Sequence, residues 1–214
     1  MKIRVATLAA CIASLPLAAR ADRGALTLDV GPALTVVGAR PSQGGGSTTL
    51  ATGGGGWLGV RYALSNAVEL SAAARWEAPG DYFHSGVEMG TNTGSVRGTL
   101  SERVQRLGAL AGVHYVRGYT WRLHFGAEVG WTRESFDRRD LLDVSDPANV
   151  HSFGLGLQSR IVNALVLAPV AGVEWQFADH WSVGVLPRVE VLVGGTSRLG
   201  LIVPVSVGYS WYIF

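Results

Sequence analysis

Charged residues and large apolar residues alternate along this chain with a period of two. Between residues 121 and 132 the odd positions are apolar, and the even positions hold every charged side chain. The same separation occurs in 67–77 and in 181–193. Successive side chains of a β-strand point to opposite faces, so each segment predicts a strand with one apolar and one charged face. One face of such a strand needs apolar surroundings and the other needs polar surroundings, which favours a sheet that closes on itself.

A frame of nine residues recurs at 62–70, 115–123 and 175–183. Each copy begins with an aromatic residue, has turn-forming residues in its middle and is apolar at its seventh and ninth positions. This pattern predicts a tight hairpin between two alternating strands. Three tight turns on one side of a barrel imply four hairpin ends on the other side. The arithmetic gives eight strands, with both termini on the tight-turn side.

The strands can be placed approximately from the alternation. We expect them at 25–37, 50–64, 67–77, 101–117, 119–133, 161–177, 181–193 and 198–214. The longer connections are then 38–49, 78–100 and 134–160, with a short one at 194–197. The stretch 150–160 also alternates. It either lengthens the sixth strand or adds a further pair, which would make a barrel of ten strands.

The positions of the aromatic residues indicate which face points outward. Alternation alone also fits a soluble, lipocalin-like barrel with an apolar interior. Here, however, aromatic residues gather at strand ends, as Tyr and Trp do at membrane interfaces. They are Tyr62, Tyr115, Trp121, Trp175 and Trp181 near the turns, and Trp76 and Trp131 at the far ends. Trp121 and Trp131 should stand about 25 Å apart along the barrel axis, which is the height of the apolar band of an outer-membrane barrel.

We therefore predict an all-β fold: an eight-stranded, antiparallel, transmembrane, up-and-down β-barrel. Trp57 is an exception, because it lies on the charged face of its strand. We interpret it as lying above the membrane or beside a bulge among the neighbouring glycines.

The first 21 residues have the features of a secretory signal peptide: a basic start, a short apolar run and a small-x-small cleavage site at 19–21. We expect a barrel domain at 22–214. Cys11 follows a lipobox-like stretch, but apolar residues continue beyond it, which favours a cysteine within the signal peptide. Removing 1–21 takes away three of the 18 basic residues and leaves 15 against 16 acidic ones. A domain with that balance is not expected to bind nucleic acid.

The charged face of the strands predicts a polar lumen. The residues assigned to it are Asp29, Arg61, Glu69, Arg75, Glu77, Arg106, His114, Arg122, His124, Glu128, Glu174, Arg188 and Glu190. Buried charges must be paired, so we expect one connected network of arginines and carboxylates that plugs the lumen. A gated ion path or a proton relay is the alternative. Two histidines without a ligand spacing do not predict a metal site, and we expect no cofactor.

The last nine residues, 206–214, form an alternating strand that ends on an aromatic residue. They resemble the C-terminal assembly signal of bacterial outer-membrane β-barrels, with Ser206, Gly208, Trp211 and Ile213 in its slots and Phe214 as the terminal aromatic residue. The whole pattern resembles the OmpA/OmpX/OmpW group of small barrels. The resemblance implies integral outer-membrane localisation and contact with outer-membrane lipid and lipopolysaccharide. It also implies delivery by periplasmic chaperones to the barrel-assembly machinery.

We expect a non-catalytic barrel with a structural, surface-contact or small-ligand-binding role. A narrow channel for small molecules is one alternative. Another is a lipid A-modifying enzyme, similar to the barrel deacylase and palmitoyl transferase families, which need a serine, a histidine and a carboxylate. The candidates are His84-Ser85 with Asp81 or Glu88, and His151-Ser152 with Asp146. Adjacent residues of a strand point to opposite faces, which argues against either pair.

Overall fold

The structure is a computed structural model and describes residues 23–39, 49–91, 94–143, 151–153, 160–194 and 198–213. Its strands are β1 (Ala25–Ala39), β2 (Thr49–Ala63), β3 (Val68–Thr91), β4 (Gly94–Arg117), β5 (Trp121–Asp143), β6 (His151–Phe153), β7 (Arg160–Gln176), β8 (Trp181–Val185), β9 (Arg188–Val193) and β10 (Arg198–Tyr212). None of the described residues forms a helix long and apolar enough to cross a membrane.

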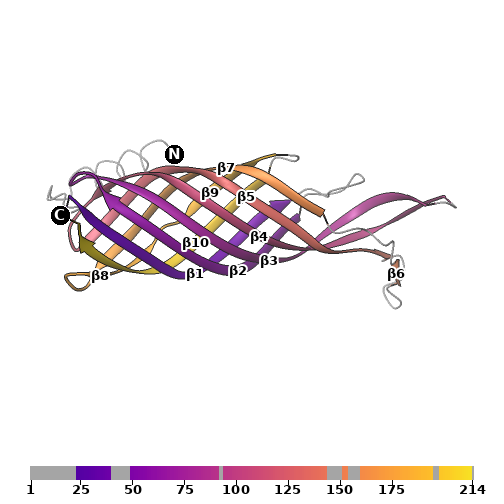
Figure 1. The fold of residues 1–214 in the computed structure, drawn as a ribbon. Coiled ribbons are helices and arrows are strands. Elements are labelled where there is room, and N and C mark those ends of the chain that lie inside the picture. The colour runs from indigo at the N-terminus through magenta and orange to yellow at the C-terminus, as the bar shows by residue number, and fades with distance from the viewer. Residues whose placement is uncertain are drawn as a thin grey trace, which may run out of the picture.

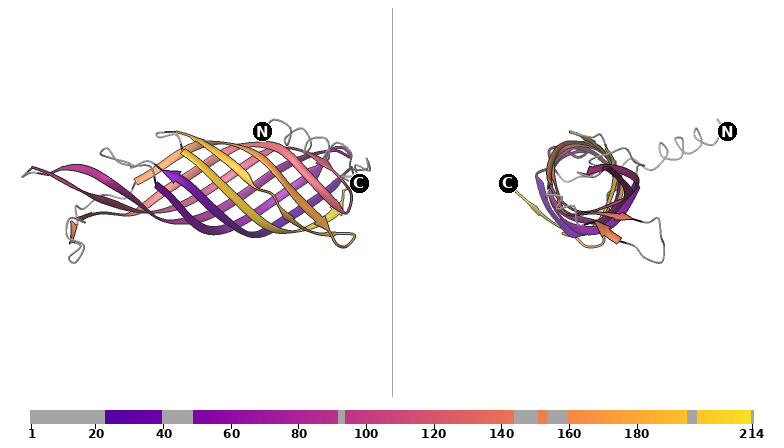
Figure 2. Two further views of the ribbon diagram at one scale, coloured as in Figure 1. Left: turned by 180° about the vertical axis from the view of Figure 1, so that it is seen from behind. Right: turned by 90° about the vertical axis from the view of Figure 1, so that its right-hand side faces the viewer.

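The strands form one antiparallel ring (Figures 1 and 2). Pairing runs from β1 through β2, β3, β4, β5 and β7, and β10 pairs back onto β1. β8 and β9 lie between β7 and β10. Both follow the same register with β7, and both follow the same register with β10, so they are two halves of one strand. The short β6 pairs with β5 alone among the described residues. The ring therefore has eight strand positions, which confirms the predicted barrel.

The three predicted tight turns lie together at the end of the barrel where β1 begins and β10 ends. Leu64 N–H donates to Val68 O at 2.9 Å across the first turn, and Phe177 N–H donates to Trp181 O at 3.2 Å across the third. In β1 and β10, Ala25 is in register with Tyr212. We call this end of the barrel the tight-turn end and the opposite end the long-strand end.

Two predicted connections were placed wrongly, because strands continue through much of 78–100 and 134–160. β3 and β4 run on to Thr91 and from Gly94, and β5 continues to Asp143, so these strands extend past the ring (Figure 1). Two of the glycines in 78–100, Gly80 and Gly86, are strand residues rather than loop residues. Gly80 and Gly86 adopt positive φ angles of 84° and 74° at two register shifts between β3 and β4. They form β-bulges inside a continuous strand, which the composition alone does not distinguish from a loop.

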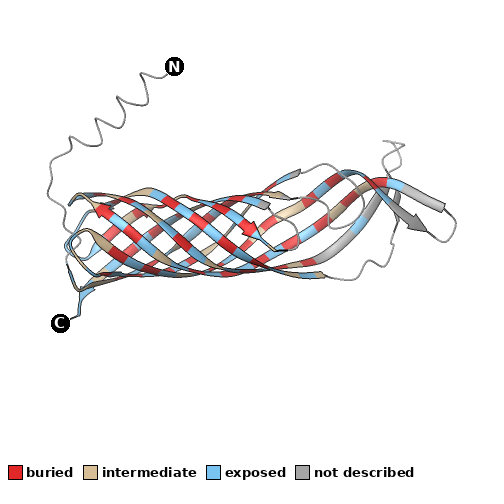
Figure 3. Cartoon of the chain, turned by 90° about the horizontal axis from the view of Figure 1, so that it is seen from above, coloured by how far each residue is buried: buried red, intermediate tan, exposed pale blue. Residues whose placement is uncertain are grey.

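Burial alternates along nearly every strand (Figure 3). Leu, Val and aromatic side chains point outward, and Trp121 is the most exposed of the large aromatics at 61%. At the tight-turn end the outward rings contact one another, with Trp121 stacked on Trp175 at 5.8 Å and Trp181 edge-on to Tyr209 at 4.9 Å between ring centroids. An apolar wall with aromatic rims and charges inside is the arrangement of a membrane barrel rather than a lipocalin-like one.

Candidate functional site: the charged lumen

The structure places all thirteen residues assigned to the lumen inside the barrel, each at most 7% exposed. It also buries three titratable residues that the sequence reasoning missed: His84, Glu102 and Glu134. Alternation continues unbroken through Glu102 and Glu134, so extending the parity of β4 and β5 would have found them. The bulge at Gly80 reverses the parity of β3 before His84, so the same rule would have placed that residue outward. The described lumen thus contains five arginines, eight carboxylates and three histidines. The excess of carboxylates over arginines is three, larger than the one expected from the sequence.

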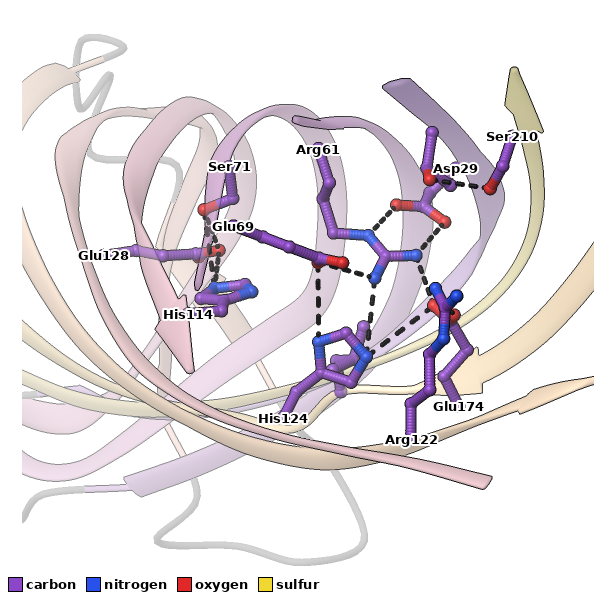
Figure 4. Close-up of polar contacts among 12 residues, drawn as sticks. Asp29, Arg61, Glu69, Ser71, His114, Arg122, His124, Glu128, Glu174 and Ser210 are labelled. Carbon is purple, nitrogen blue, oxygen red and sulfur yellow. Dashed lines mark hydrogen bonds and ion pairs between the residues drawn. The ribbon is translucent and has the colours of Figure 1, made fainter. Parts of the chain in front are cut away.

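The first group of charges lies nearest the tight-turn end, and we call it the lower cluster (Figure 4). Its centre is Arg61, which donates to Asp29 at 2.7 and 3.0 Å and to Glu69 at 3.2 Å, and which also pairs with Glu174. His124 lies 3.8 Å from both Glu69 and Glu174, and Arg122 lies 3.5 Å from Glu174. One guanidinium on β2 therefore joins carboxylates of β1, β3 and β7.

The middle cluster is built around Glu128 of β5. Arg188 donates to both of its oxygens, at 2.7 and 3.0 Å, in the forked geometry that makes arginine–carboxylate pairs strong. Ser71 donates to the same carboxylate at 3.1 Å, and His114 Nε2 lies 3.0 Å from it. A small cavity, with room for about one water molecule, lies between this cluster and the lower one and is lined by Asp29, Arg61, Ser71, Glu128 and Arg188 among others.

Trp57 belongs to the middle cluster, and the prediction of a bulge beside it was wrong, because its register with β1 and β3 is unbroken. It is 5% exposed and lies inside the lumen, with the Arg188 guanidinium 4.0 Å from its ring centroid. A guanidinium over an indole face is a favourable cation–π contact, and it explains why an aromatic residue occupies the charged face of β2. Apolar neighbours complete its surroundings: Leu110, Ala164, Val166, Ala168 and Leu192.

The upper cluster lies toward the long-strand end and has no exposed surface at its centre. Arg106 donates to Glu77 at 2.9 Å and to Glu190 at 3.0 Å, and it lies 3.5 Å from Glu134. Arg75 pairs with Glu190 and lies 3.2 Å from Glu77. Arg106, Glu77 and Glu190 are each 0% exposed, so no part of these three side chains is accessible to water.

Inward-facing glycines make room for these long side chains. A Cβ on Gly108 would lie 2.9 Å from Arg75 Nε, and one on Gly126 would lie 2.5 Å from Cδ2 of the His114 ring. Such distances are shorter than van der Waals contact. In a narrow barrel, small and large inward residues must alternate between neighbouring strands, and glycine is the small partner here.

Ion pairs connect the charges into three clusters rather than the single network expected. Among the described residues, no ion pair joins the middle cluster to the upper one. Trp57 and its apolar neighbours occupy part of the lumen. They take space that ion pairs between the middle and upper clusters would need. A second apolar group closes the long-strand end, formed by Val37, Ala51, Tyr82, Val104 and Phe136. This group also escaped the sequence reasoning, which considered only charges on the inward face.

The proposed catalytic groupings do not assemble among the described residues. His84 is fully buried beside Glu102 at 3.5 Å, whereas Ser85 is exposed on the other side of the strand. Asp81 instead accepts a hydrogen bond from Arg103 at 2.9 Å. Side chains of His151 and Ser152, and all of Asp146, lie outside the described residues.

The lumen also holds a serine, a histidine and a glutamate in contact, but not as a catalytic relay. His114 uses the same nitrogen, Nε2, toward Ser71 at 3.4 Å and toward Glu128 at 3.0 Å. A relay needs the base to face the hydroxyl with one nitrogen and the carboxylate with the other. No group of three or more metal-ligating side chains occurs in the described part of the chain.

The residues assigned to the assembly signal lie on β10, where it closes the barrel against β1. Ser206 and Gly208 face inward, and Trp211 and Ile213 face outward. Trp211 is in register with Leu26 of β1. Phe214, and the segment 1–21 assigned as a signal peptide, lie outside the described residues.

Comparison with solved structures identifies the fold. The chain is similar to Ail, the attachment invasion locus protein of Yersinia pestis, with 15% identity, 88% of this chain and 99% of that one covered, and a TM-score of 0.54. It is similar to Neisserial surface protein A, with 12% identity, 89% and 100% coverage, and a TM-score of 0.56. The outer membrane protein OprG from Pseudomonas aeruginosa gives 12% identity, 89% and 97% coverage, and a TM-score of 0.55.

The fold is that of a small outer-membrane β-barrel. No family model matches the sequence, and no curated protein matches it. At 12–15% identity the likeness concerns the fold, so the barrel's role has to be argued from its own residues.

Proposed function

We propose that this chain is a non-catalytic integral protein of the outer membrane, whose lumen is a structural plug and whose strands carry a surface-contact region beyond the membrane. The observation that supports a plug is the upper cluster, where Arg106, Glu77 and Glu190 are fully buried. The interiors of eight-stranded barrels are just wide enough for side chains to fill. The strand extensions of β3, β4 and β5 then face the exterior, with the tight turns in the periplasm.

Planar-bilayer recording tests the plug directly. The folded protein should give no steady conductance, because ion-paired side chains occupy the lumen in place of water. A shift in gel mobility between unheated and boiled samples in SDS serves as the control that the inserted protein is a closed barrel. A large and stable conductance from protein that passes this control would refute the plug and support the narrow channel.

The proposal includes export and assembly. We propose that the segment 1–21 is cleaved, so that the exported chain begins at Asp22, and that periplasmic chaperones deliver it to the barrel-assembly machinery. Sequencing the N-terminus of protein purified from membranes tests the cleavage. A chain that still begins at Met1 would contradict it.

Replacing both Trp211 and Ile213 with serine should sharply lower the amount of protein in the outer membrane. Both side chains face outward on the strand that closes the ring, and Trp211 continues the aromatic rim through its contact with Tyr209 at 6.0 Å. Fractionation and immunoblotting measure the effect. The matched control replaces Val205 and Val207, which are outward residues of the same strand, with serine. Equal loss in both variants would indicate general destabilisation rather than a C-terminal signal.

A further inference from the structure

Three exposed side chains lie in a row across the apolar wall toward the long-strand end of the barrel. They are Trp76 of β3, Leu107 of β4 and Trp131 of β5, which are 51%, 53% and 44% exposed. If the chain spans the outer membrane as proposed above, these residues mark the level where acyl chains give way to headgroups, because Trp favours that boundary.

An exposed arginine lies directly at this boundary. Arg133 follows Trp131 by two residues on the same outward face of β5. The register aligns Arg133 with Leu107, and Leu107 with Trp76. Neighbouring strands are about 4.8 Å apart, so the Cα atoms of Arg133 and Trp76 lie roughly 10 Å apart across the wall.

Arg133 has no anionic partner in the described part of the chain. The outward neighbours on β4 and β7 are Gln105, which is exposed, and Asn163, which is in register with Arg133. Both can donate hydrogen bonds, and neither carries a negative charge. Arg103, farther out on β4, differs in this respect because Asp81 accepts its hydrogen bonds at 2.9 and 3.4 Å.

We propose that Arg133, with Gln105 and Asn163 beside it, binds a phosphate group of an outer-leaflet glycolipid, with the acyl chains of that lipid lying against Trp131, Leu107 and Trp76. An arginine fork suits a phosphate because it offers several donors in one plane. The adjacent amides supply neutral donors, and the apolar side chains below them suit hydrocarbon. The occupant is therefore a phosphorylated glycolipid of the lipopolysaccharide class, and the proposal rests on the membrane orientation proposed above.

The experiment compares wild-type protein with Arg133→Ala and Arg133→Lys, using the full exported chain folded in detergent. Purified lipopolysaccharide is titrated, and the shift in unfolding temperature gives the apparent affinity. We expect R133A to bind roughly tenfold more weakly, as loss of one charge-assisted contact predicts. R133K should fall between R133A and wild type, because lysine keeps the charge but lacks the fork. Arg23→Ala is the matched control, because Arg23 is exposed at the opposite end of the barrel.

Two further probes separate the possible ligands. Dephosphorylated lipopolysaccharide should bind wild-type protein as weakly as the intact lipid binds R133A. The site would be overturned if wild type and R133A bound the intact lipid equally. It would also be overturned if wild type bound the dephosphorylated lipid as tightly as the intact lipid. Phosphatidylglycerol vesicles that compete as well as lipopolysaccharide would overturn the glycolipid assignment. The heat-dependent gel shift distinguishes these failures from failure of the barrel itself, since it does not depend on Arg133.

Discussion

Replacing Arg106 with alanine should lower the free energy of unfolding by about 3–5 kcal/mol, the usual cost of breaking a buried ion pair. Arg106 is fully buried between carboxylates of three other strands, Glu77, Glu134 and Glu190. Without it, Arg75 is the one remaining guanidinium beside Glu77 and Glu190 among the described residues. The penalty comes from carboxylates left in a dry interior with too little positive charge.

Urea unfolding of the protein in detergent, followed by tryptophan fluorescence, measures this effect. The matched control is Arg103→Ala. Arg103 lies on the same strand but faces outward with its side chain 49% exposed, and its ion pair with Asp81 is open to solvent. Exposed pairs contribute little to stability, so this variant should unfold close to wild type. If R106A unfolds as wild type does, water must enter the upper cluster, and the dry plug would be wrong.

The sequence predicts the ring and the lumen composition because both depend on one local rule. Alternation assigns each residue to a face, and the position of the aromatics decides which face meets lipid. Each residue of the lumen set can be assigned from its own strand, without knowing its partner. This is why residues as far apart as Asp29 and Glu190 could be placed inside before any contact was known.

The pairing of those residues could not be predicted, because it depends on the shear of the barrel and on bulges. Arg61 meets Glu174, which is 113 residues away along the chain. Such a contact is set by strand tilt across the lumen. Gly80 and Gly86 mislead for a related reason: a positive φ occurs both in loops and in bulges, and composition does not separate the two.

The division into clusters also has a physical cause that alternation cannot express. Trp57 lies on the charged face, but its ring needs a cation on one side and apolar contacts on the other. It therefore occupies lumen space that a continuous ion-pair network would need. A rule that sorts residues into inward and outward positions does not say which inward side chains compete for the same space in the lumen.

The strand formed by β8 and β9 is the least regularly bonded part of the ring. Register pairs with β10 stop at Val185 and resume at Arg188, and the gap includes Pro187 opposite Val203 and Pro204. Pairs with β7 are also interrupted, near Pro169. Proline has no N–H to donate to a ladder, so these positions lose wall hydrogen bonds. We infer that contacts across the lumen compensate for that loss.

Those contacts come from the two charged residues of β9. Arg188 reaches Glu128 on β5, and Glu190 reaches Arg75 on β3 and Arg106 on β4. The strand with interrupted ladders is thus fastened to the far wall by ion pairs. In this view the charges in the lumen do more than fill space, because they hold one strand in the ring.

Arg188→Ala should therefore destabilise this strand more than the rest of the barrel. We expect a loss of about 3–5 kcal/mol in the free energy of unfolding, because Glu128 loses its bidentate partner. Hydrogen exchange measured by mass spectrometry should show faster exchange in 181–193 than in wild type, with β3 and β4 changed less. Val189→Ala is the matched control on the same strand, since Val189 faces outward and is 51% exposed. If exchange instead rises equally around the ring, the ion pairs stabilise the barrel as a whole, and the fastening of this strand is refuted.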